Sequence, residues 1–121
     1  MKVIGFVRVS TGHQKLSIDN QTAEITDYCK KTDGLELIDI LQEENVSGGS
    51  IERTGFNKML DLVDNKEIDG IVCLNLSRIG RKASMTLDLI NRCLDNDVFI
   101  YDMKDGTDTR TPGGRMSVKM R

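Results

Sequence analysis

Apolar and polar residues alternate along the chain in blocks that predict strands and helices in turn. Short blocks rich in β-branched residues have the composition of strands buried in a sheet. Longer blocks between them repeat apolar residues three and four positions apart, which is the period of an amphipathic helix. Because parallel strands need crossover connections, this alternation predicts an α/β fold with a mostly parallel central sheet and helices on both faces. The predicted strands cover residues 2–9, 35–42, 71–74 and 98–101.

The first and last predicted helices are marked by residues that favour helix ends. Ser17 is expected to cap the amino end of the first helix and Gly34 to stop it. Thr111 before Pro112 has the pattern of an N-cap and a first-turn proline, so a last helix should begin there, and the chain stops inside it. The expected apolar faces are Ile18, Ile25, Tyr28 and Cys29 in the first helix, Phe56, Met59, Leu60 and Val63 in a second helix over residues 55–66, and Thr86, Leu89, Ile90, Cys93 and Leu94 in a third helix ending near Asn96.

Length and composition narrow the class of protein. A chain of 121 residues is enough for one hydrophobic core, so we expect one domain. The content of 38% hydrophobic and 30% charged residues excludes a disordered chain and a membrane protein. With 17 Lys and Arg against 19 Asp and Glu, the net charge of -2 provides no overall positive field, a balance that leans away from nucleic acid. Cys29, Cys73 and Cys93 are widely spaced, and we expect them to be reduced core residues of a cytoplasmic protein.

The end of the first predicted strand brings a guanidinium beside a hydroxyl. Side chains alternate along a strand, so Arg8 and Ser10 should point to the same side. A buried arginine is unfavourable unless it meets an anion. One interpretation is an ion pair with Glu43, Glu44 or Asp102, with Ser10 as a capping residue. The other is an anionic ligand held next to the hydroxyl, and the spacing alone leaves both open.

Polar segments after two other predicted strands carry further arginines. Arg78 and Arg81 are three residues apart, so they can share one face of a helical turn, and two planar guanidinium forks suit one phosphodiester. A solvated basic turn is the alternative. Residues 43–50, predicted to form a surface loop, contain Ser47 and are followed by Arg53. Because all these segments follow strands, they should share the carboxyl edge of the parallel sheet.

Four motifs in register resemble the catalytic domain of the serine recombinases, the resolvase and invertase family. They are FVRVST at residues 6–11, SIDNQ at 17–21, SGG at 47–49 leading to RTGF at 53–56, and RIGR at 78–81. The similarity runs from Lys2 to the helix near Pro112 and closes with Asp108, Thr109 and residues 114–116. Each motif alone is weak evidence, whereas four in the same order and spacing are a specific signal.

The resemblance implies a DNA strand transferase that uses neither a metal nor another cofactor. Ser10 would attack a phosphodiester of double-stranded DNA, form a 5′-phosphoserine linkage and free a 3′-hydroxyl. The free hydroxyls would later reseal the strands. Carried over by position, the resemblance assigns Arg8, Arg78 and Arg81 to the scissile phosphate and gives Arg53 an assisting catalytic role from a neighbouring loop. It assigns Gln21, Glu44, Ser47 and Asp69 to further substrate contacts.

The resemblance also implies partners beyond DNA. Full-length members of the family form homodimers that assemble into a tetramer, and no membrane is involved. They continue through a long helix into a DNA-binding domain, which is absent from this chain as it stops at Arg121. Residues 102–121 contain five Lys or Arg against three Asp, so this end is locally basic, and such charges contribute most of the affinity for DNA phosphates.

Metal and triad chemistry have little support. Glu43 and Glu44, or Asp102 with Asp105 and Asp108, offer the carboxylates that Mg²⁺ takes, but acids close in sequence are typical of a solvated face. The one histidine, His13, has no third group to orient it, so a hydrolytic triad is not expected.

One residue departs from the family pattern, and two alternative functions stay open. Many small resolvases carry an aspartate where this chain has Ser77. The first alternative is an inactive module that pairs with full-length subunits through its last helix. The second is a small-molecule phosphatase that uses the same arginine cluster.

Overall fold

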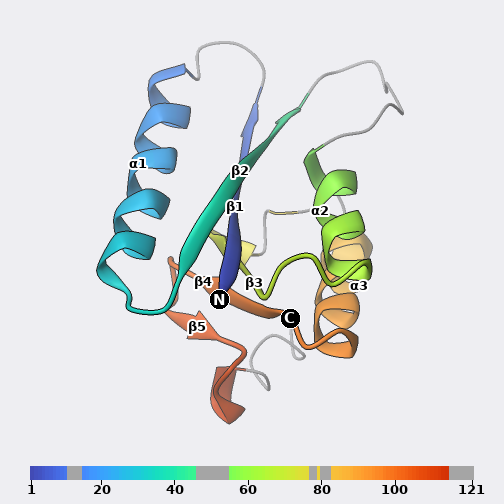
Figure 1. Ribbon diagram of the computed structural model, residues 1–121. Helices are drawn as coiled ribbons and strands as arrows, with labels where there is room; N and C mark the ends of the chain where they lie inside the picture. Colours follow the sequence, from blue (N-terminus) through green and yellow to red (C-terminus); the bar gives the residue numbers. More distant parts are fainter. Residues whose placement is uncertain (11–14, 46–54, 77–78, 80–82, 115–121) are drawn as a thin grey trace.

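The structure is a computed structural model that describes residues 1–10, 15–45, 55–76, 79 and 83–114. It confirms the predicted alternation of strands and helices (Figure 1). In chain order the elements are β1 (Lys2–Ser10), α1 (Lys15–Lys31), β2 (Glu36–Asn45), α2 (Gly55–Asp64), β3 (Gly70–Cys73), α3 (Ala83–Asp95), β4 (Phe99–Asp102) and β5 (Thr107–Asp108).

The strands form one five-stranded sheet in the order β2-β1-β3-β4-β5. The pairs β1–β2, β1–β3 and β3–β4 are parallel, and β5 is antiparallel to β4. This confirms the predicted α/β fold with a mostly parallel sheet. β1 lies between β2 and β3, as its apolar composition indicated.

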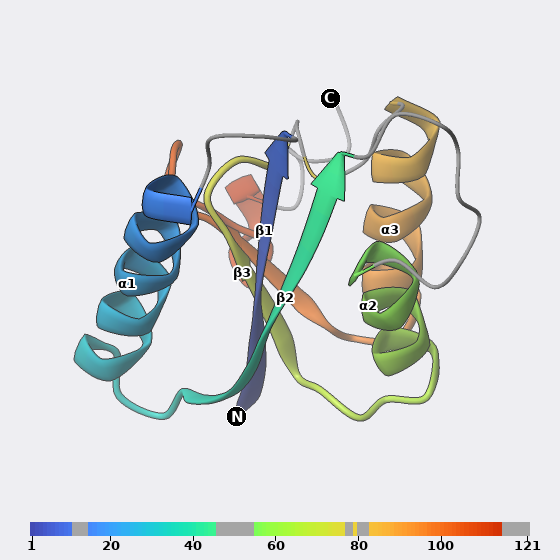
Figure 2. The same ribbon diagram turned by 90° about the horizontal axis from the view of Figure 1, so that it is seen from above.

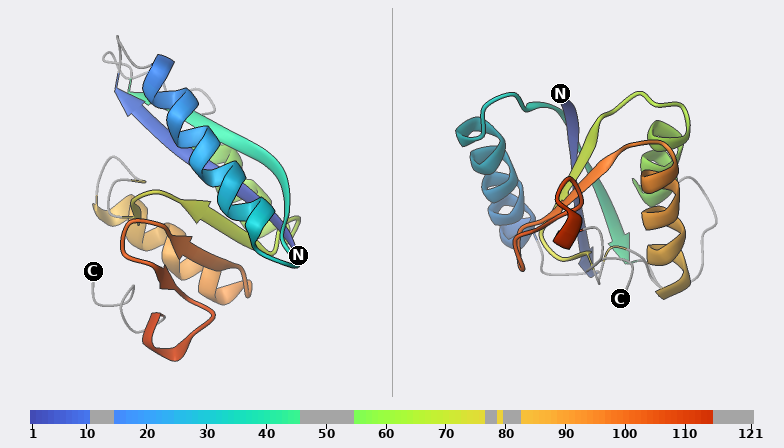
Figure 3. Two further views of the ribbon diagram at one scale, coloured as in Figure 1. Left: turned by 90° about the vertical axis from the view of Figure 1, so that its left-hand side faces the viewer. Right: turned by 90° about the horizontal axis from the view of Figure 1, so that it is seen from below.

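The helices cover both faces of the sheet. α1 lies on one face, and α2 and α3 lie together on the other (Figures 2 and 3). Gly5 permits the close approach of α1 to β1, because a Cβ at this position would stand 2.8 Å from Cγ2 of Ile25. The glycine therefore sets how closely α1 packs on the central strand.

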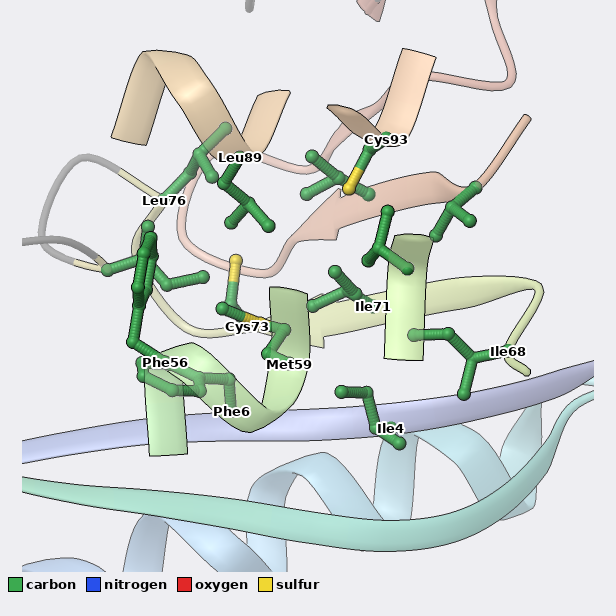
Figure 4. Close-up of a cluster of buried hydrophobic side chains, with 14 of the residues drawn as sticks. Ile4, Phe6, Phe56, Met59, Ile68, Ile71, Cys73, Leu76, Leu89 and Cys93 are labelled. Carbon is green, nitrogen blue, oxygen red and sulfur yellow. The ribbon is translucent and has the colours of Figure 1, made fainter. Parts of the chain in front are cut away.

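Two groups of buried side chains form the core, one on each face. Along β1, Ile4 and Phe6 belong to the larger group under α2 and α3, and Val3 and Val7 belong to the smaller group under α1. This alternation follows the two-residue period of a strand. Figure 4 shows the larger group, in which side chains of β1 and β3 meet those of both helices.

The helix faces predicted from apolar spacing pack on the sheet wherever their side chains are described, and only the Ile18 side chain lies outside that part. Tyr28 of α1 also stacks on Tyr101 of β4, with ring centroids 4.4 Å apart. The buried members of the predicted faces are Ile25, Cys29, Phe56, Met59, Val63, Thr86, Leu89, Ile90 and Cys93, while Tyr28, Leu60 and Leu94 are half-buried.

The three cysteines are buried and free, as expected of core residues. Burial raises the pKa of the Cys93 thiol to about 12. At neutral pH that thiol stays protonated and behaves as a small apolar side chain.

Several predicted boundaries differ from the structure. α2 ends at Asp64 instead of residue 66, and the start of α1 and the end of β2 are wrong. α1 begins at Lys15, so Ser17 lies in its first turn and is not the N-cap. Lysine and leucine are better helix formers than serine, which favours extension through residues 15 and 16. β2 continues to Asn45, so Glu43 and Glu44 are strand residues rather than loop residues. They pair with Arg8 and Val9 of β1 through the main chain, which does not depend on side-chain polarity.

The polar segment 102–111 contains a strand that the sequence pattern does not reveal. β5 has two residues, too few for any alternation, and pairs with Tyr101 and Asp102 of β4. The predicted cap after it is confirmed: the Gly114 N–H donates to Oγ1 of Thr111 at 2.9 Å, and residues 112–114 are helical.

A charge pair fastens β5 to the sheet. The Arg110 guanidinium donates to both oxygens of Asp108, with its NH2 group 2.7 Å from Oδ2, and lies 4.0 Å from the centre of the Phe99 ring. Burial alone would raise the pKa of the Asp108 carboxyl, but the hydrogen bonds and charge of Arg110 outweigh it and lower that pKa below its ordinary value.

We expect the Arg110→Gln variant to be less stable than the wild-type chain at neutral pH, by a margin that shrinks in acid. A carboxyl with a lowered folded pKa contributes stability above its unfolded pKa of about 3.9, and this is lost as the pH falls through the folded pKa. Urea denaturation between pH 6 and pH 2 measures the margin. Lys104→Gln, which removes an exposed charge from the turn between β4 and β5, serves as the control. A margin that is constant with pH would contradict the ion pair.

Gly70 at the start of β3 is enclosed by an aromatic ring. A Cβ at this position would overlap the ring of Phe99 on β4. We expect Gly70→Ala to lower the free energy of unfolding by about 1–3 kcal/mol, because added atoms in a packed core force their neighbours to move. Gly113→Ala is the control, since its Cβ would meet nothing within 4 Å. Phe99→Leu should restore part of the loss in the double variant, and equal stability of the two alanine variants would refute the overlap.

Candidate active site

The carboxyl ends of β1 and β2 finish side by side at one edge of the sheet. Ser10 and Asn45, the last residues of the two strands, are register partners, and Arg8 is paired with Glu43 in the same ladder. The tips of both arrows lie next to each other in Figure 2, at the same end as the start of α1. The main chain of Arg8 and Ser10 therefore lies at the edge that the sequence predicted, and Glu44 lies one rung before the end of β2.

The segment that follows β3 has two buried side chains, one on each side of residues 77 and 78 in the sequence. Leu76 and Ile79 belong to the core under α2 and α3, and they are 0% and 2% exposed. The Ile79 N–H donates to the Leu76 carbonyl oxygen at 3.2 Å. The core therefore holds the chain at Leu76 and again at Ile79.

Asp102, the last residue of β4, is completely buried beside this segment. Its Oδ2 accepts a hydrogen bond from the Leu76 N–H at 3.2 Å, and its Oδ1 accepts one from the Lys104 N–H at 2.9 Å. The sequence suggested an ion-pair partner for Arg8 or a magnesium ligand at this position. The main-chain contacts add a role that no local sequence pattern indicates, because the two segments are far apart along the chain. An ion pair with Arg8 stays a prediction, because the Arg8 side chain lies outside the described part of the structure.

Gln21 lies near the amino end of α1, on the half-buried part of the helix. Ile25, one turn further on, is fully buried against β1 next to Gly5. This packing fixes α1 on the middle of the central strand, and α1 begins at the end of the sheet where β1 finishes.

Asp69 does not join these residues, and its expected substrate contact is not supported by its position. It directly precedes β3 at the amino edge of the sheet, where its Oδ2 accepts a hydrogen bond from the Lys2 N–H at 2.7 Å. β1 is nine residues long, so at 3.3 Å a residue Lys2 and Ser10 are roughly 26 Å apart. Residues before parallel strands lie at the opposite edge from residues after them, and Asp69 instead caps the start of β1.

Several expected site residues lie outside the described part of the chain. These are Ser47, Arg53, Arg78 and Arg81, and only the main chain is described for Arg8, Ser10 and Glu44. His13, which was not expected to be catalytic, also lies outside the described part. The described residues show the main chain from which these segments begin or end. They are the ends of β1, β2 and β4, together with the buried residues Leu76 and Ile79.

The described residues contain neither a candidate metal cluster nor a helix that could span a membrane. No group of three or more His, Cys, Asp or Glu side chains there could hold a metal ion. No helix in that part is both long and apolar enough to cross a membrane.

Comparison with known sequences identifies the family. The model of the "Resolvase, N terminal domain" family matches residues 3–121. The chain is 32% identical over 113 residues to a DNA-invertase of Escherichia phage P1, covering 93% of this chain and 54% of the invertase. It is 31% identical over 105 residues to the Transposon Tn1546 resolvase of Enterococcus faecium, covering 87% of this chain and 49% of that resolvase. The chain spans about half the length of these relatives.

Solved structures share the whole fold. The N-terminal catalytic domain of TP901-1 integrase superposes with a TM-score of 0.81 at 26% identity, covering 99% of this chain and 90% of that domain. A resolvase family site-specific recombinase from Streptococcus pneumoniae gives a TM-score of 0.79 at 26% identity, covering 98% of this chain and 82% of the other. Arg8 and Ser10 stand at the end of the central strand β1. The family match over residues 3–121 shows that the chain belongs to the resolvase family and is a serine recombinase catalytic domain.

Proposed function

We propose that this domain cuts and rejoins double-stranded DNA during site-specific recombination, with Ser10 as the nucleophile. The observation that carries the proposal is the place of Arg8 and Ser10 at the carboxyl end of the central strand β1, in a chain that matches the resolvase catalytic domain over residues 3–121. Functional residues of parallel α/β sheets gather at this edge. A DNA-invertase and a transposon resolvase among the relatives support DNA as the substrate.

The proposed reaction is a transfer of the DNA phosphate to Ser10 and back. The Oγ of Ser10 loses its proton and forms a bond to phosphorus, the bond from phosphorus to the 3′ oxygen breaks, and that oxygen gains a proton. The 5′-phosphoserine linkage keeps the energy of the broken phosphodiester, so a 3′-hydroxyl can reverse the step on a new partner strand. No external energy source is needed for resealing.

Arginines are well suited to the charge that builds up in this step. Arg8, Arg78 and Arg81 are assigned to the scissile phosphate, whose oxygens carry most of the negative charge in the transition state. Arg53 is assigned an assisting catalytic role. Guanidinium groups held in place before the reaction can lower the barrier by several kcal/mol, roughly, without a metal. Gln21, Glu44 and Ser47 are retained as further substrate contacts, while Asp69 is not, because it lies at the other edge of the sheet.

Assembly and location follow from the same proposal. Strand exchange needs more than one catalytic domain, so we propose that the full-length protein forms homodimers that assemble into a tetramer on DNA. The site of action is the cytoplasm, where the DNA is. Contacts with DNA phosphates should make binding weaken steeply as salt concentration rises.

Trapping the covalent intermediate tests the function. The full-length protein is incubated with a DNA substrate nicked so that the cut end diffuses away and cannot be resealed. We expect a protein–DNA adduct, and after digestion mass spectrometry should find the phosphodeoxynucleotide on the peptide that contains Ser10. An adduct on another residue would overturn the assignment, and a folded protein that forms no adduct would favour the inactive module.

A further inference from the structure

We propose that Asp102 is a positioning residue for DNA cleavage, which acts by tying the segment before Arg78 to the end of β4. This inference rests on the proposed function, because it concerns the placement of groups that bind the scissile phosphate. Asp102 is 0% exposed, although a buried carboxylate is unfavourable unless hydrogen bonds or a cation compensate for lost water.

The two oxygens of this carboxylate bind two different segments. Oδ2 accepts from the Leu76 N–H, in the segment after β3, and Oδ1 accepts from the Lys104 N–H, in the turn after β4. Hydrogen bonds to a charged acceptor are about twice as strong as those between neutral groups. One side chain therefore joins the two exits from the sheet.

Main-chain hydrogen bonds align these exits so that the carboxylate can reach both. Cys73 and Asp102 are register partners at the ends of β3 and β4. Beyond them, the Met103 N–H donates to the Cys73 carbonyl at 2.9 Å and the Lys104 N–H to the Leu74 carbonyl at 3.0 Å. The ladder stops there, and the Asp102 carboxylate makes the next link to the β3 exit, at Leu76.

Leu76 is the residue at which a shift in the main chain would matter most. It stands two residues before Arg78, and its side chain is fully buried next to Leu89 of α3 (Figure 4). Its carbonyl oxygen accepts a hydrogen bond from the Ile79 N–H. With side chain, N–H and carbonyl all engaged, Leu76 is a fixed point from which the arginine segment departs. Loss of the Asp102 contact would free one of these three restraints.

The expected effect falls on the chemical step. Displacing a catalytic group by about 1 Å can lower a rate by about 100-fold, even when the change lies far from the reacting atoms. We expect Asp102→Asn to slow single-turnover cleavage by about 10- to 100-fold, with the Kd for DNA changed by less than about threefold, because overall DNA affinity is spread over many phosphate contacts. Asparagine keeps the shape of the side chain, but its NH2 group would face the N–H of either Leu76 or Lys104, so one of the two hydrogen bonds is lost.

Thr109→Val provides a matched control. Thr109 is 3% exposed. Its Oγ1 accepts a hydrogen bond at 2.8 Å from the main-chain N–H of Ile100, which lies on β4 like Asp102. It therefore makes the same kind of contact, away from Leu76. Thr109→Val should lose stability of similar order yet cleave at the wild-type rate. Asp102→Asn cleaving at the wild-type rate, or losing no more rate than Thr109→Val, would overturn the inference.

Amide hydrogen exchange supplies a readout that needs no activity and remains informative if the asparagine variant folds poorly. In the wild-type protein the Leu76 amide should exchange slowly, and in Asp102→Asn it should exchange faster than in Thr109→Val. A Leu76 amide that exchanges rapidly in the wild-type protein would refute the restraint. If the wild-type protein forms no adduct at Ser10, the proposed function fails as well, whereas an adduct with an unaffected Asp102→Asn overturns only this inference.

Discussion

Ser10→Ala is expected to abolish the covalent protein–DNA adduct and all recombination while leaving the fold and DNA binding intact. The substitution removes one oxygen, the atom that bonds to phosphorus in the proposed reaction. Without this nucleophile the arginines can still bind the phosphate, but the covalent phosphoserine intermediate cannot form. The rate should fall to the detection limit in a suicide-substrate assay, and the affinity for DNA in a gel-shift assay should stay close to the wild-type value.

The structure offers a control for this substitution. Ser84 in the first turn of α3 is exposed, so Ser84→Ala makes the same chemical change on a different element, at a residue that has no role in the proposed reaction. It should leave both adduct formation and recombination unaltered. Both serine variants should also unfold at a urea concentration near the wild-type midpoint. An adduct that persists in Ser10→Ala would refute the assignment of the nucleophile.

The fold could be predicted where apolar residues repeat over a whole element. Phe56, Met59 and Val63 mark the buried side of α2 so clearly that the helix and its orientation follow from spacing. Glu43 and Glu44 could not be placed, because their strand conformation comes from pairing with β1 and not from their own side chains. β5 is a still stronger case, since a two-residue strand has no period of its own.

The position of a candidate residue was predictable where it stands at the end of a strand. Arg8 and Ser10 occupy the end of β1, and the topology alone assigns that end to the functional edge. Asp69 shows the limit of assigning roles by motif position, because a residue that precedes β3 must lie at the other edge. The contact between Asp102 and Leu76 depends on how β3 and β4 exit the sheet together, which only the three-dimensional structure shows.

The net charge illustrates a different limit of sequence composition. The net charge of -2 argued against a nucleic-acid-binding protein, yet the chain belongs to the resolvase family. Net charge is a sum over the whole chain, whereas binding a phosphate depends on the few charges around it. The arginines of the motifs carry the information that the sum conceals.

Leu89→Ala is expected to have the largest effect on stability. The Leu89 side chain is 0% exposed and lies in the core cluster that also holds Leu76 and Ile79, the anchors of the arginine segment. Removing a buried leucine side chain down to alanine costs about 2–5 kcal/mol, through lost burial and the cavity left behind. Because small domains are stable by only about 5–15 kcal/mol, this change consumes a large share of the total.

The same helix supplies the comparison that isolates burial. Leu87 is 40% exposed, and Leu87→Ala makes the identical change two residues away on α3. Leucine and alanine are both good helix formers, so this variant should stay within about 0.5 kcal/mol of the wild-type chain. Urea denaturation of both variants, with equal slopes, measures the difference. If both variants lost the same free energy of unfolding, the predicted face of α3 would not pack on the sheet. The proposed packing of Leu89 with Leu76 and Ile79 would then be wrong as well.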